Sequence, residues 1–483
     1  MIYIINEMNF VDFLVLDKKY FKCKKLMLYL LFLLLISCNK KENIKTQDGT
    51  PKSQLRITGN NFFPDGSGFV SIEIIFDKID DIDYLLIQKS GSGIFSQKIQ
   101  KSELTLNYNY RCEVKPGDPE LFELVFSISY FDRTKSENKF VSIINKRGLF
   151  VKDLKRIARV TGSSLASEDF SNPNNTASRW DVGGTDLGII WEMNPGKYGI
   201  FFGDTFGRDF KPNAKNPGPN GGNWRSNVLG FSHSKNLDSG IVFTNMATEG
   251  GSSAIEMIAG RKAGLPTSIP TAAVRANGKD YVHYFNTDPI LAGVKFYYSG
   301  LYKSDDDGQH WSKVETVLFP ADSRFALAGY YKKDGYVYMI GTPAYRDKPA
   351  YLARFRESDI EIQNNYEYWN GDSGIWMKGN ENNASVLIPG TVGELSFLFN
   401  ETIGKWIIVY GDIGHGFVSL RTAKEITGTW SEVVKLVSPD DYPMHYGPYL
   451  HPLSAKGNIL YLIYLCGSHT MCFLMRAEIV DRD

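Results

Sequence analysis

The sequence lacks an excess of charge of either sign. Its 483 residues contain 54 Lys and Arg against 54 Asp and Glu, so the charges cancel. Affinity for nucleic acid comes mainly from clustered Lys and Arg that neutralise phosphates. We therefore expect no nucleic acid among the partners of this protein.

Cysteine is also scarce. Five cysteines in 483 residues cannot form a disulfide framework that holds the fold together. Cys466 and Cys472 flank the tip of an expected hairpin, which leaves open a disulfide in an oxidising compartment or two buried thiols. The sequence has no CxxC or HxxxH spacing, so we expect no zinc site and no cofactor.

A short apolar run lies near the N-terminus. Lys24 and Lys25 precede residues 26–36, and the run ends in Leu-Ile-Ser before Cys38. This order is typical of a signal peptide that ends in a lipobox. The run falls short of the roughly 20 residues needed to span a bilayer. We expect residues 1–38 to be a lipoprotein signal peptide and Cys38 to carry the lipid; a buried hydrophobic helix is the alternative.

The region after the leader contains a polar segment and then alternating strands. Residues 39–54 show no periodicity, and we interpret them as a tether. Residues 55–147 contain runs such as 69–76 and 121–130, separated by Gly, Asp and Asn. Strands of this length and number suit a small immunoglobulin-like β-sandwich.

Residues 149–483 contain an internal repeat. Each repeat has an apolar strand, a turn with Gly, and a second strand rich in aromatic residues. The five repeats are 184–204, 270–284, 325–339, 393–410 and 449–464. One hairpin per unit, with room for a further strand pair, predicts an all-β fold with a five-bladed β-propeller. The segment 304–311, of Asp-box type, supports this fold, and two stacked sheets are the alternative.

The first hairpin contains the main candidate for chemistry. Its turn, 194–197, pairs residues whose numbers sum to about 390 or 391, so Asp186 and Asp204 face each other on neighbouring strands. Like charges directly opposite destabilise a sheet, and crowding raises one carboxyl pKa while the other group stays ionised. We interpret the pair as catalytic. The alternative is that each Asp caps a strand end.

Other polar residues are expected at the same end of the hairpins. Glu394 begins the fourth hairpin and is the candidate for a third catalytic carboxylate, unless it is an ordinary rim residue. Tyr446, Tyr449 and His451 accompany the fifth hairpin and are candidate substrate ligands, although a lone His more often has a structural role.

A further group of candidates suits sugar recognition. Trp224, Arg225 and Asn227 follow a loop rich in Gly, Asn and Pro, and Arg324 precedes the third hairpin. An aromatic face can stack on a sugar ring, and guanidinium or amide groups can bind hydroxyls. The alternative is that Trp224 is a core residue and the arginines are solvated.

Several short motifs resemble those of a known propeller family. They are Gly183–Gly188, Phe202–Phe206, Trp224–Asn227, Gly393–Ser396 and Tyr446–Tyr449. The family was long catalogued as a domain of unknown function and includes endo-D-arabinanases, glycoside hydrolases that cut α-D-arabinofuranosyl linkages. The resemblance covers about residues 155–480 and implies five blades with Asp186 and Asp204 as the acidic pair.

The leader and the first domain resemble those of Bacteroidetes-type glycan-utilisation lipoproteins. This resemblance implies an anchor in outer-membrane lipid through Cys38, on the periplasmic or surface face, and other glycan-utilisation proteins as partners.

We therefore expect a glycoside hydrolase that acts on a polysaccharide through two carboxylates, one as acid and the other as base or nucleophile. The sequence leaves open which Asp is the acid and whether the anomeric configuration is retained or inverted. The rival hypotheses are a non-catalytic glycan-binding propeller and a sialidase-like hydrolase.

Overall fold

The computed structural model describes residues 51–481 except 59–60, 63, 65–67, 90–95, 116–117, 119–120, 146–147, 165–167, 211–221, 289–294, 440–441, 443–444 and 467–470. The expected signal peptide, Cys38 and most of the expected tether lie outside these residues. The chain divides into two compact units at the boundary between Gly148 and Leu149. In the described part of the chain, no helix is both long and apolar enough to cross a membrane.

The smaller unit contains two sheets and one hydrophobic core; the strands pair antiparallel except β2 (Asn61–Phe62), which pairs with β8 (Lys139–Ile144) in parallel. Alternate residues of its strands are buried, as in the strand Phe69–Phe76, where Val70, Ile72, Ile74 and Phe76 all point inward. Both sheets contribute to the same core. The first sheet consists of β1 (Leu55–Ile57), β3 (Phe69–Phe76) and β6 (Asn107–Glu113); the second consists of β2 (Asn61–Phe62), β8 (Lys139–Ile144), β7 (Leu121–Tyr130), β4 (Ile82–Lys89) and β5 (Ser96–Gln100), in spatial order. The short helix η1 (Lys101–Glu103) links β5 to β6.

The larger unit contains five main antiparallel sheets. The first sheet consists of β11 (Ile189–Asn194), β12 (Lys197–Phe202), β14 (Val228–Ser232) and β15 (Phe243–Met246), and the second of β16 (Thr267–Ala276), β17 (Lys279–Thr287), β18 (Phe296–Ser304) and β19 (Ser312–Pro320). The third sheet consists of β20 (Leu327–Lys333), β21 (Tyr336–Thr342), β22 (Ala350–Arg356), β23 (Glu367–Asn370) and β24 (Ile375–Lys378), with β25 (Val386–Ile388) paired to β22. The fourth sheet consists of β26 (Leu395–Asn400), β27 (Lys405–Asp412), β28 (Phe417–Ala423) and β29 (Val434–Val437), and the last of β30 (His445–Leu450), β31 (Ile459–Cys466), β32 (Met471–Asp481) and β9 (Leu149–Arg159).

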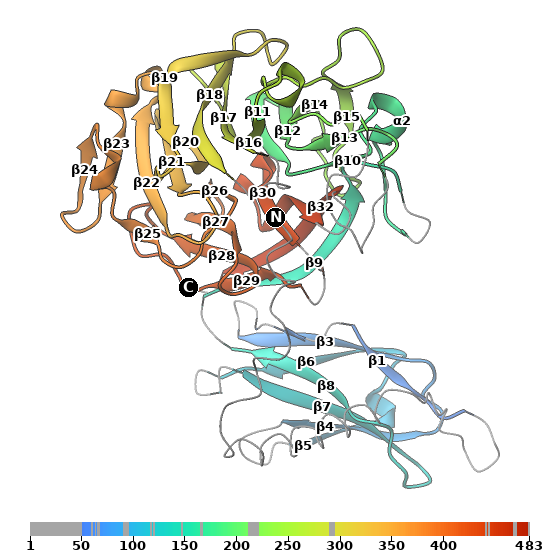
Figure 1. The fold of residues 1–483 in the computed structure, drawn as a ribbon. Helices are drawn as coiled ribbons and strands as arrows, with labels where there is room; N and C mark the ends of the chain where they lie inside the picture. The colour runs from blue at the N-terminus through green and yellow to red at the C-terminus, as the bar shows by residue number, and fades with distance from the viewer. Residues whose placement is uncertain are drawn as a thin grey trace, which may run out of the picture. The chain divides into compact units, whose positions relative to one another are not determined.

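The five sheets are arranged around a common centre (Figure 1). The first strand of each sheet contacts the first strand of the next, in the order β11, β16, β20, β26 and β30, and β30 contacts β11 again. The last sheet takes its fourth strand, β9, from the beginning of the unit. Each hairpin identified in the sequence supplies the first two strands of one sheet.

Packing between sheets explains why several strands are continuously apolar. Strand β27, for example, is buried on both faces, because its sheet lies between two others. The segment 304–311 forms the turn between β18 and β19, and Nε1 of Trp311 donates to the carbonyl of Gly308. The Trp311 ring packs edge-on against Trp191 and Phe201 of the first sheet, and so joins two neighbouring sheets.

Antiparallel pairing brings two kinds of strand end to the same edge of the larger unit. The start of the first strand and the end of the second strand of each sheet lie together there, and we call this the site edge. The helices outside the sheets are short: α2 (Thr176–Trp180), η2 (Arg261–Ala263), η4 (Glu357–Asp359), η5 (Gln363–Asn365), η6 (Glu381–Asn383) and η7 (Pro452–Ala455).

Candidate active site

Asp186 and Asp204 lie opposite each other at the site edge of the first sheet. The short strands β10 (Gly184–Thr185) and β13 (Thr205–Phe206) pair on one side of them, and β11 and β12 pair on the other. Between these ladders, the amide of Asp186 donates to the carbonyl of Asp204 at 2.8 Å, and the amide of Gly203 donates to the carbonyl of Asp186 at 2.7 Å. The register agrees with the sum of 390 that the turn predicts, since Thr185 pairs with Thr205.

The environment of Asp186 raises the pKa of its carboxyl to about 6. Burial is the main cause, and the negative charge of Glu394 adds to it. Two groups lower the pKa of Asp186. The hydroxyl of Tyr446 donates to Oδ1 at 2.6 Å, and Arg346 acts through its positive charge. Asp186 is partly exposed. Its carboxyl is therefore shielded from bulk water but remains accessible to a ligand.

The carboxyl of Asp204 has a higher pKa, about 7. Burial is again the main cause, followed by repulsion from Asp186. Nε1 of Trp224 donates to Oδ1 of Asp204 at 2.8 Å, and the hydroxyl of Thr267 lies 3.5 Å from the same oxygen. These donors and the charge of Arg261 lower the pKa of Asp204. The two acids therefore interact with each other but have separate sets of partners.

Glu394 joins the site through an ion pair. Nε of Arg346 donates to Oε1 of Glu394 at 2.7 Å, and Nη2 of Arg346 contacts the same oxygen. The guanidinium also lies 5.2 Å from the ring centre of Tyr446. Glu394 thus holds the arginine that stabilises the carboxylate of Asp186.

The loop that carries Arg346 is strained. Tyr345 and Arg346 have φ angles of +78° and +64°, a region that residues other than glycine seldom adopt. A Cβ on Gly393 would lie 3.1 Å from the carbonyl of Gly411 and 3.4 Å from Cγ of Arg346. Glycine at position 393 therefore leaves room for the stem of Arg346 beside Glu394.

The segment 224–227 positions one site residue and otherwise has a structural role. The backbone of Arg225 pairs with that of Thr205, which places Trp224 beside Asp204. The buried guanidinium of Arg225 donates to the carbonyls of Ala254 and Asp181, both at 2.7 Å.

Asn227 is also committed to the backbone. Its buried amide donates to the carbonyls of Ile258 and Ser268 and accepts from the amides of Met257 and Ile258. Sugar contact was expected of Arg225 and Asn227, but their polar groups satisfy buried backbone groups instead. Only Trp224 of this motif reaches the acid pair.

The fifth hairpin contributes Tyr446 but neither of the other two candidates. Tyr449 is buried in the core, and its hydroxyl lies near the backbone of Ala273. His451 lies beyond the far end of β30 and is buried, with Nδ1 accepting from the amide of Leu453 at 3.1 Å. Burial lowers the pKa of His451 to about 3, so it is neutral. Both residues serve the fold at their positions.

Arg324 does not join the acid pair either. Its guanidinium binds backbone carbonyls of the segment 381–384, on the outer part of the third sheet.

Arg346, Arg261 and Thr267 lie at the site although the sequence did not indicate them. Arg346 follows the second strand of the third sheet, just as Asp204 follows the second strand of the first sheet. Arg261 and Thr267 lie before and at the start of β16, as Asp186 lies before β11. Equivalence between hairpins was therefore a usable signal.

Cys472 is a free, buried thiol. Burial raises its pKa to about 12, and its sulfur lies 3.3 Å from the hydroxyl of Thr185. Cys472 therefore forms no disulfide, and its environment makes its thiol unreactive. Among the described residues, no group of three or more His, Cys, Asp and Glu could hold a metal ion.

Two fungal proteins resemble this chain in sequence. Notoamide biosynthesis cluster protein J of Aspergillus sp. (strain MF297-2) is 28% identical over 311 residues, which are 59% of this chain and 80% of that protein. Its counterpart J' from Aspergillus versicolor is 26% identical over 309 residues, covering 59% and 81%.

Among solved structures, a family 117 glycoside hydrolase from Zobellia galactanivorans matches with 13% identity and a TM-score of 0.41, over 69% of this chain and 92% of that one. The Bacillus subtilis arabinanase Arb43A matches with 10% identity and a TM-score of 0.36, over 61% and 94%.

A family model described as a domain of unknown function (DUF4185) matches residues 171–470. This stretch contains Asp186, Asp204, Glu394 and Tyr446, together with the arginine and tryptophan that flank them. Because the match spans more than half of the chain, the protein belongs to the DUF4185 family.

Proposed function

We propose that this protein is a glycoside hydrolase whose five sheets are the blades of a β-propeller and whose catalytic groups are Asp186 and Asp204. The observation that carries the proposal is the acid pair itself. Two partly exposed carboxyl groups face each other with pKa values raised to about 6 and about 7. A structural sheet gains nothing from such a pair, whereas acid–base chemistry near neutral pH requires it.

The surroundings favour Asp204 as the acid and Asp186 as the base or nucleophile. The charge of Asp186 raises the pKa of Asp204, so Asp186 ionises first and keeps Asp204 protonated. Tyr446 and Arg346 stabilise the carboxylate form of Asp186. In this assignment Asp204 protonates the leaving oxygen, while Asp186 activates water or attacks the anomeric carbon.

The neighbouring side chains suit a sugar substrate. Trp224 presents an aromatic ring beside Asp204, with the guanidinium of Arg261 3.7 Å from the ring centre. Arg261 is partly exposed and can donate to hydroxyls. Together with the motif resemblance, these groups lead us to propose internal α-D-arabinofuranosyl linkages of a polysaccharide as the substrate.

The sialidase-like alternative has less support. Such an enzyme needs several arginines to hold a substrate carboxylate. The described site offers Arg261 and Arg346, but Arg346 is already paired with Glu394. A sialylated glycan nevertheless belongs in the assay panel, because turnover of it would replace the arabinan proposal.

The test compares Asp186→Asn and Asp204→Asn with a matched control. Asp280 is a buried carboxyl that, like Asp204, accepts an indole hydrogen bond, here from Trp191 at 2.9 Å. It also pairs with Arg275 and lies next to the turn before β17, away from the site edge. On soluble mycobacterial arabinogalactan, both site variants should release reducing ends at least ~100-fold more slowly, the lower range for acid–base catalysis. Folded Asp280→Asn protein should keep its activity.

Two results would overturn the proposal. Site variants that keep most of their activity would show that the pair is not catalytic. Wild-type protein that retards polysaccharides in a gel but releases no reducing ends from any of them would be a binding protein instead.

We also propose that Cys38 anchors the protein in the outer membrane, where it works with other glycan-utilisation proteins. The smaller unit, which we propose to be an immunoglobulin-like domain, follows Cys38 in the sequence and precedes the propeller. Metabolic labelling with a palmitate analogue should mark the wild-type protein but not Cys38→Ser, and unlabelled wild-type protein would refute the anchor.

A further inference from the structure

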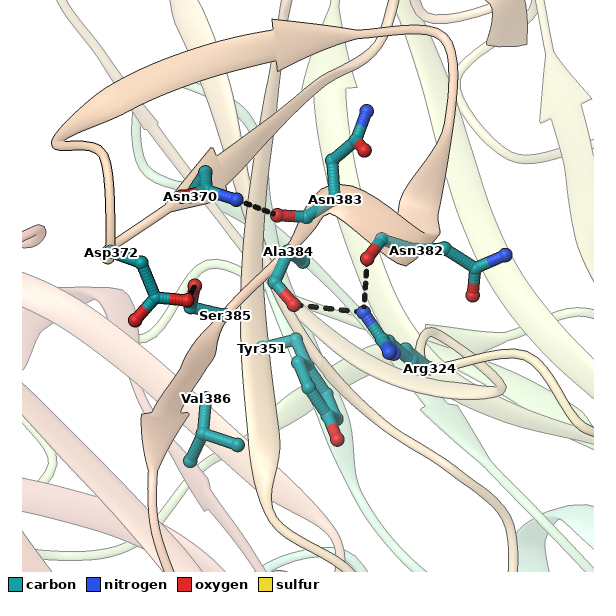
Figure 2. A pocket seen from close by; sticks show the side chains of 9 residues that line it. All are labelled: Arg324, Tyr351, Asn370, Asp372, Asn382, Asn383, Ala384, Ser385 and Val386. Carbon is teal, nitrogen blue, oxygen red and sulfur yellow. Dashed lines mark hydrogen bonds between the residues drawn. The ribbon is translucent and has the colours of Figure 1, made fainter.

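A polar pocket of about 480 Å³ lies on the outer part of the third sheet. This volume is within the range of small-molecule sites. Figure 2 shows its lining: Arg324, Tyr351, Asn370, Asp372, Asn382, Asn383, Ala384, Ser385 and Val386. None of these residues contributes to the acid pair.

The backbone around this outer pocket is held firmly. Nη1 of Arg324 donates to the carbonyls of Asn382 at 2.9 Å and Ala384 at 2.8 Å, and to that of Glu381 at 3.3 Å. Nδ2 of Asn370 donates to the carbonyl of Asn383 at 3.0 Å (Figure 2). The segment is therefore ordered before any ligand arrives, which reduces the entropy lost on binding.

The side chains of the same segment are available to a ligand. Within the described part of the chain, the side-chain amides of Asn382 and Asn383 make no hydrogen bond, and Nη1 is the guanidinium nitrogen through which Arg324 binds. Asn382 is exposed, and Asn383 and Arg324 are partly exposed. Each amide offers both donors and an acceptor, the combination that sugar hydroxyls use.

Tyr351 adds an aromatic surface. Its ring is partly exposed, and the guanidinium of Arg324 lies 4.8 Å from the ring centre. An aromatic ring can stack on the apolar face of a sugar while the amides bind its hydroxyls. The pocket carries one basic and one acidic group, Arg324 and Asp372, so it favours a neutral ligand.

The pocket and the acid pair share the site edge. Tyr351 lies five positions after Arg346, whose guanidinium pairs with Glu394 and acts on Asp186. Five residues of extended chain span at most ~18 Å. A polysaccharide bound at the acids can therefore continue toward Tyr351.

We propose that this outer pocket is a distal subsite for neutral saccharide, which holds the polymer away from the bond that is cut. The inference rests on the proposed function for the identity of the polymer. In the outer pocket, Tyr351, Asn382 and Asn383 bind sugar and do not contact the reacting atoms.

The test uses the full chain in affinity gels that contain soluble mycobacterial arabinogalactan, linear 1,5-α-L-arabinan or, as an acidic polymer, hyaluronan. Tyr351→Ala and the double variant Asn382→Ala/Asn383→Ala should each weaken binding to a neutral polymer by ~10-fold or more. The double variant changes only side chains that make no described hydrogen bond, so it guards against loss of folding. Activity on a short aryl arabinofuranoside should stay at the wild-type level.

Tyr336→Ala is the matched control. Tyr336 is a partly exposed tyrosine of the same sheet, also stacked with arginine, since Arg356 lies 3.9 Å from its ring centre. It lies at the other end of β21, so its removal should leave binding unchanged.

The proposal is overturned if both pocket variants bind every neutral polymer as tightly as the wild type, if the wild type binds none of them, or if only hyaluronan is retarded. Failure of the proposed function would appear elsewhere, as turnover retained by Asp204→Asn. Gel retardation reports binding whether or not the polymer is cut, so the two failures can be told apart.

Discussion

The hydroxyl of Tyr446 donates a hydrogen bond of 2.6 Å to Oδ1 of Asp186, although 260 positions separate the two residues. Asp186 precedes the first strand of the first sheet, and Tyr446 lies in the first strand of the last sheet. The bond therefore spans the junction at which the ring of sheets closes. It stabilises the carboxylate form of Asp186 and opposes the effect of burial on its pKa.

Tyr446→Phe should shift the acidic limb of the pH–activity profile to higher pH. The variant removes a donor to a charged group, worth ~1.5–3 kcal/mol, and each pH unit corresponds to ~1.4 kcal/mol, so the shift should be about one unit or more. The pH dependence of kcat/KM measures it. A profile that keeps its acidic limb while kcat falls would mean that Tyr446 acts on the substrate rather than on Asp186.

Trp224→Phe should shift the basic limb of the pH–activity profile. The indole lowers the pKa of Asp204, so its loss raises that pKa and keeps the acid protonated to higher pH. The basic limb of kcat/KM should then move to higher pH while the acidic limb stays in place. Phe keeps an aromatic ring beneath Arg261, so a fall in activity without movement of the basic limb would contradict the role given to the indole.

Glu394→Gln and Arg346→Gln should move the acidic limb in opposite directions. Glu394 raises the pKa of Asp186 and Arg346 lowers it, so the first variant moves the limb to lower pH and the second to higher pH. The double variant should lie close to the wild type, as a double-mutant cycle would reveal. Movement of both single variants in the same direction would refute the electrostatic role of the pair.

Asp204→Asn should stabilise the protein, and more so at higher pH. Burial and repulsion from Asp186 raise the folded-state pKa of Asp204 from its ordinary value of 3.8 to about 7, so between these values the folded state binds more protons than the unfolded state. Stability is therefore lost as pH rises from about 4 toward 7 or 8. Asp204→Asn has no carboxyl to ionise and so avoids this loss of stability. Its Tm should equal that of the wild type near pH 4 and exceed it by ~2–4 °C or more near pH 8, for an effect of order 1 kcal/mol. A constant difference in Tm across this range would contradict the raised pKa.

Short-range geometry could be predicted from the sequence, but contacts between sheets could not. The turn at 194–197 fixes the register of one hairpin, so the apposition of Asp186 and Asp204 needed only local information. Arg346 contacts Glu394 from a loop 48 positions away, and a left-handed backbone sets its direction. Neither fact has a local signal.

Polar residues were the other source of error. Arg225, Asn227 and His451 were expected to meet substrate because charged and amide groups are usually exposed. In the fold each of them satisfies a backbone group. Arg225 and Asn227 do so for loops from elsewhere in the chain, whereas His451 accepts from the amide of Leu453, two positions further on. Trp224 was expected to stack on a sugar, and in the structure its indole nitrogen donates to Asp204.

The pairing of β9 with β32 has a consequence for biosynthesis. The last sheet combines β9 with β30, β31 and β32, so it cannot form until the ribosome has made β32. Tyr446 belongs to that sheet, and Asp186 gains its partner only then. A nascent polypeptide that still lacks β30 to β32 thus has both acids but not the finished surroundings of Asp186.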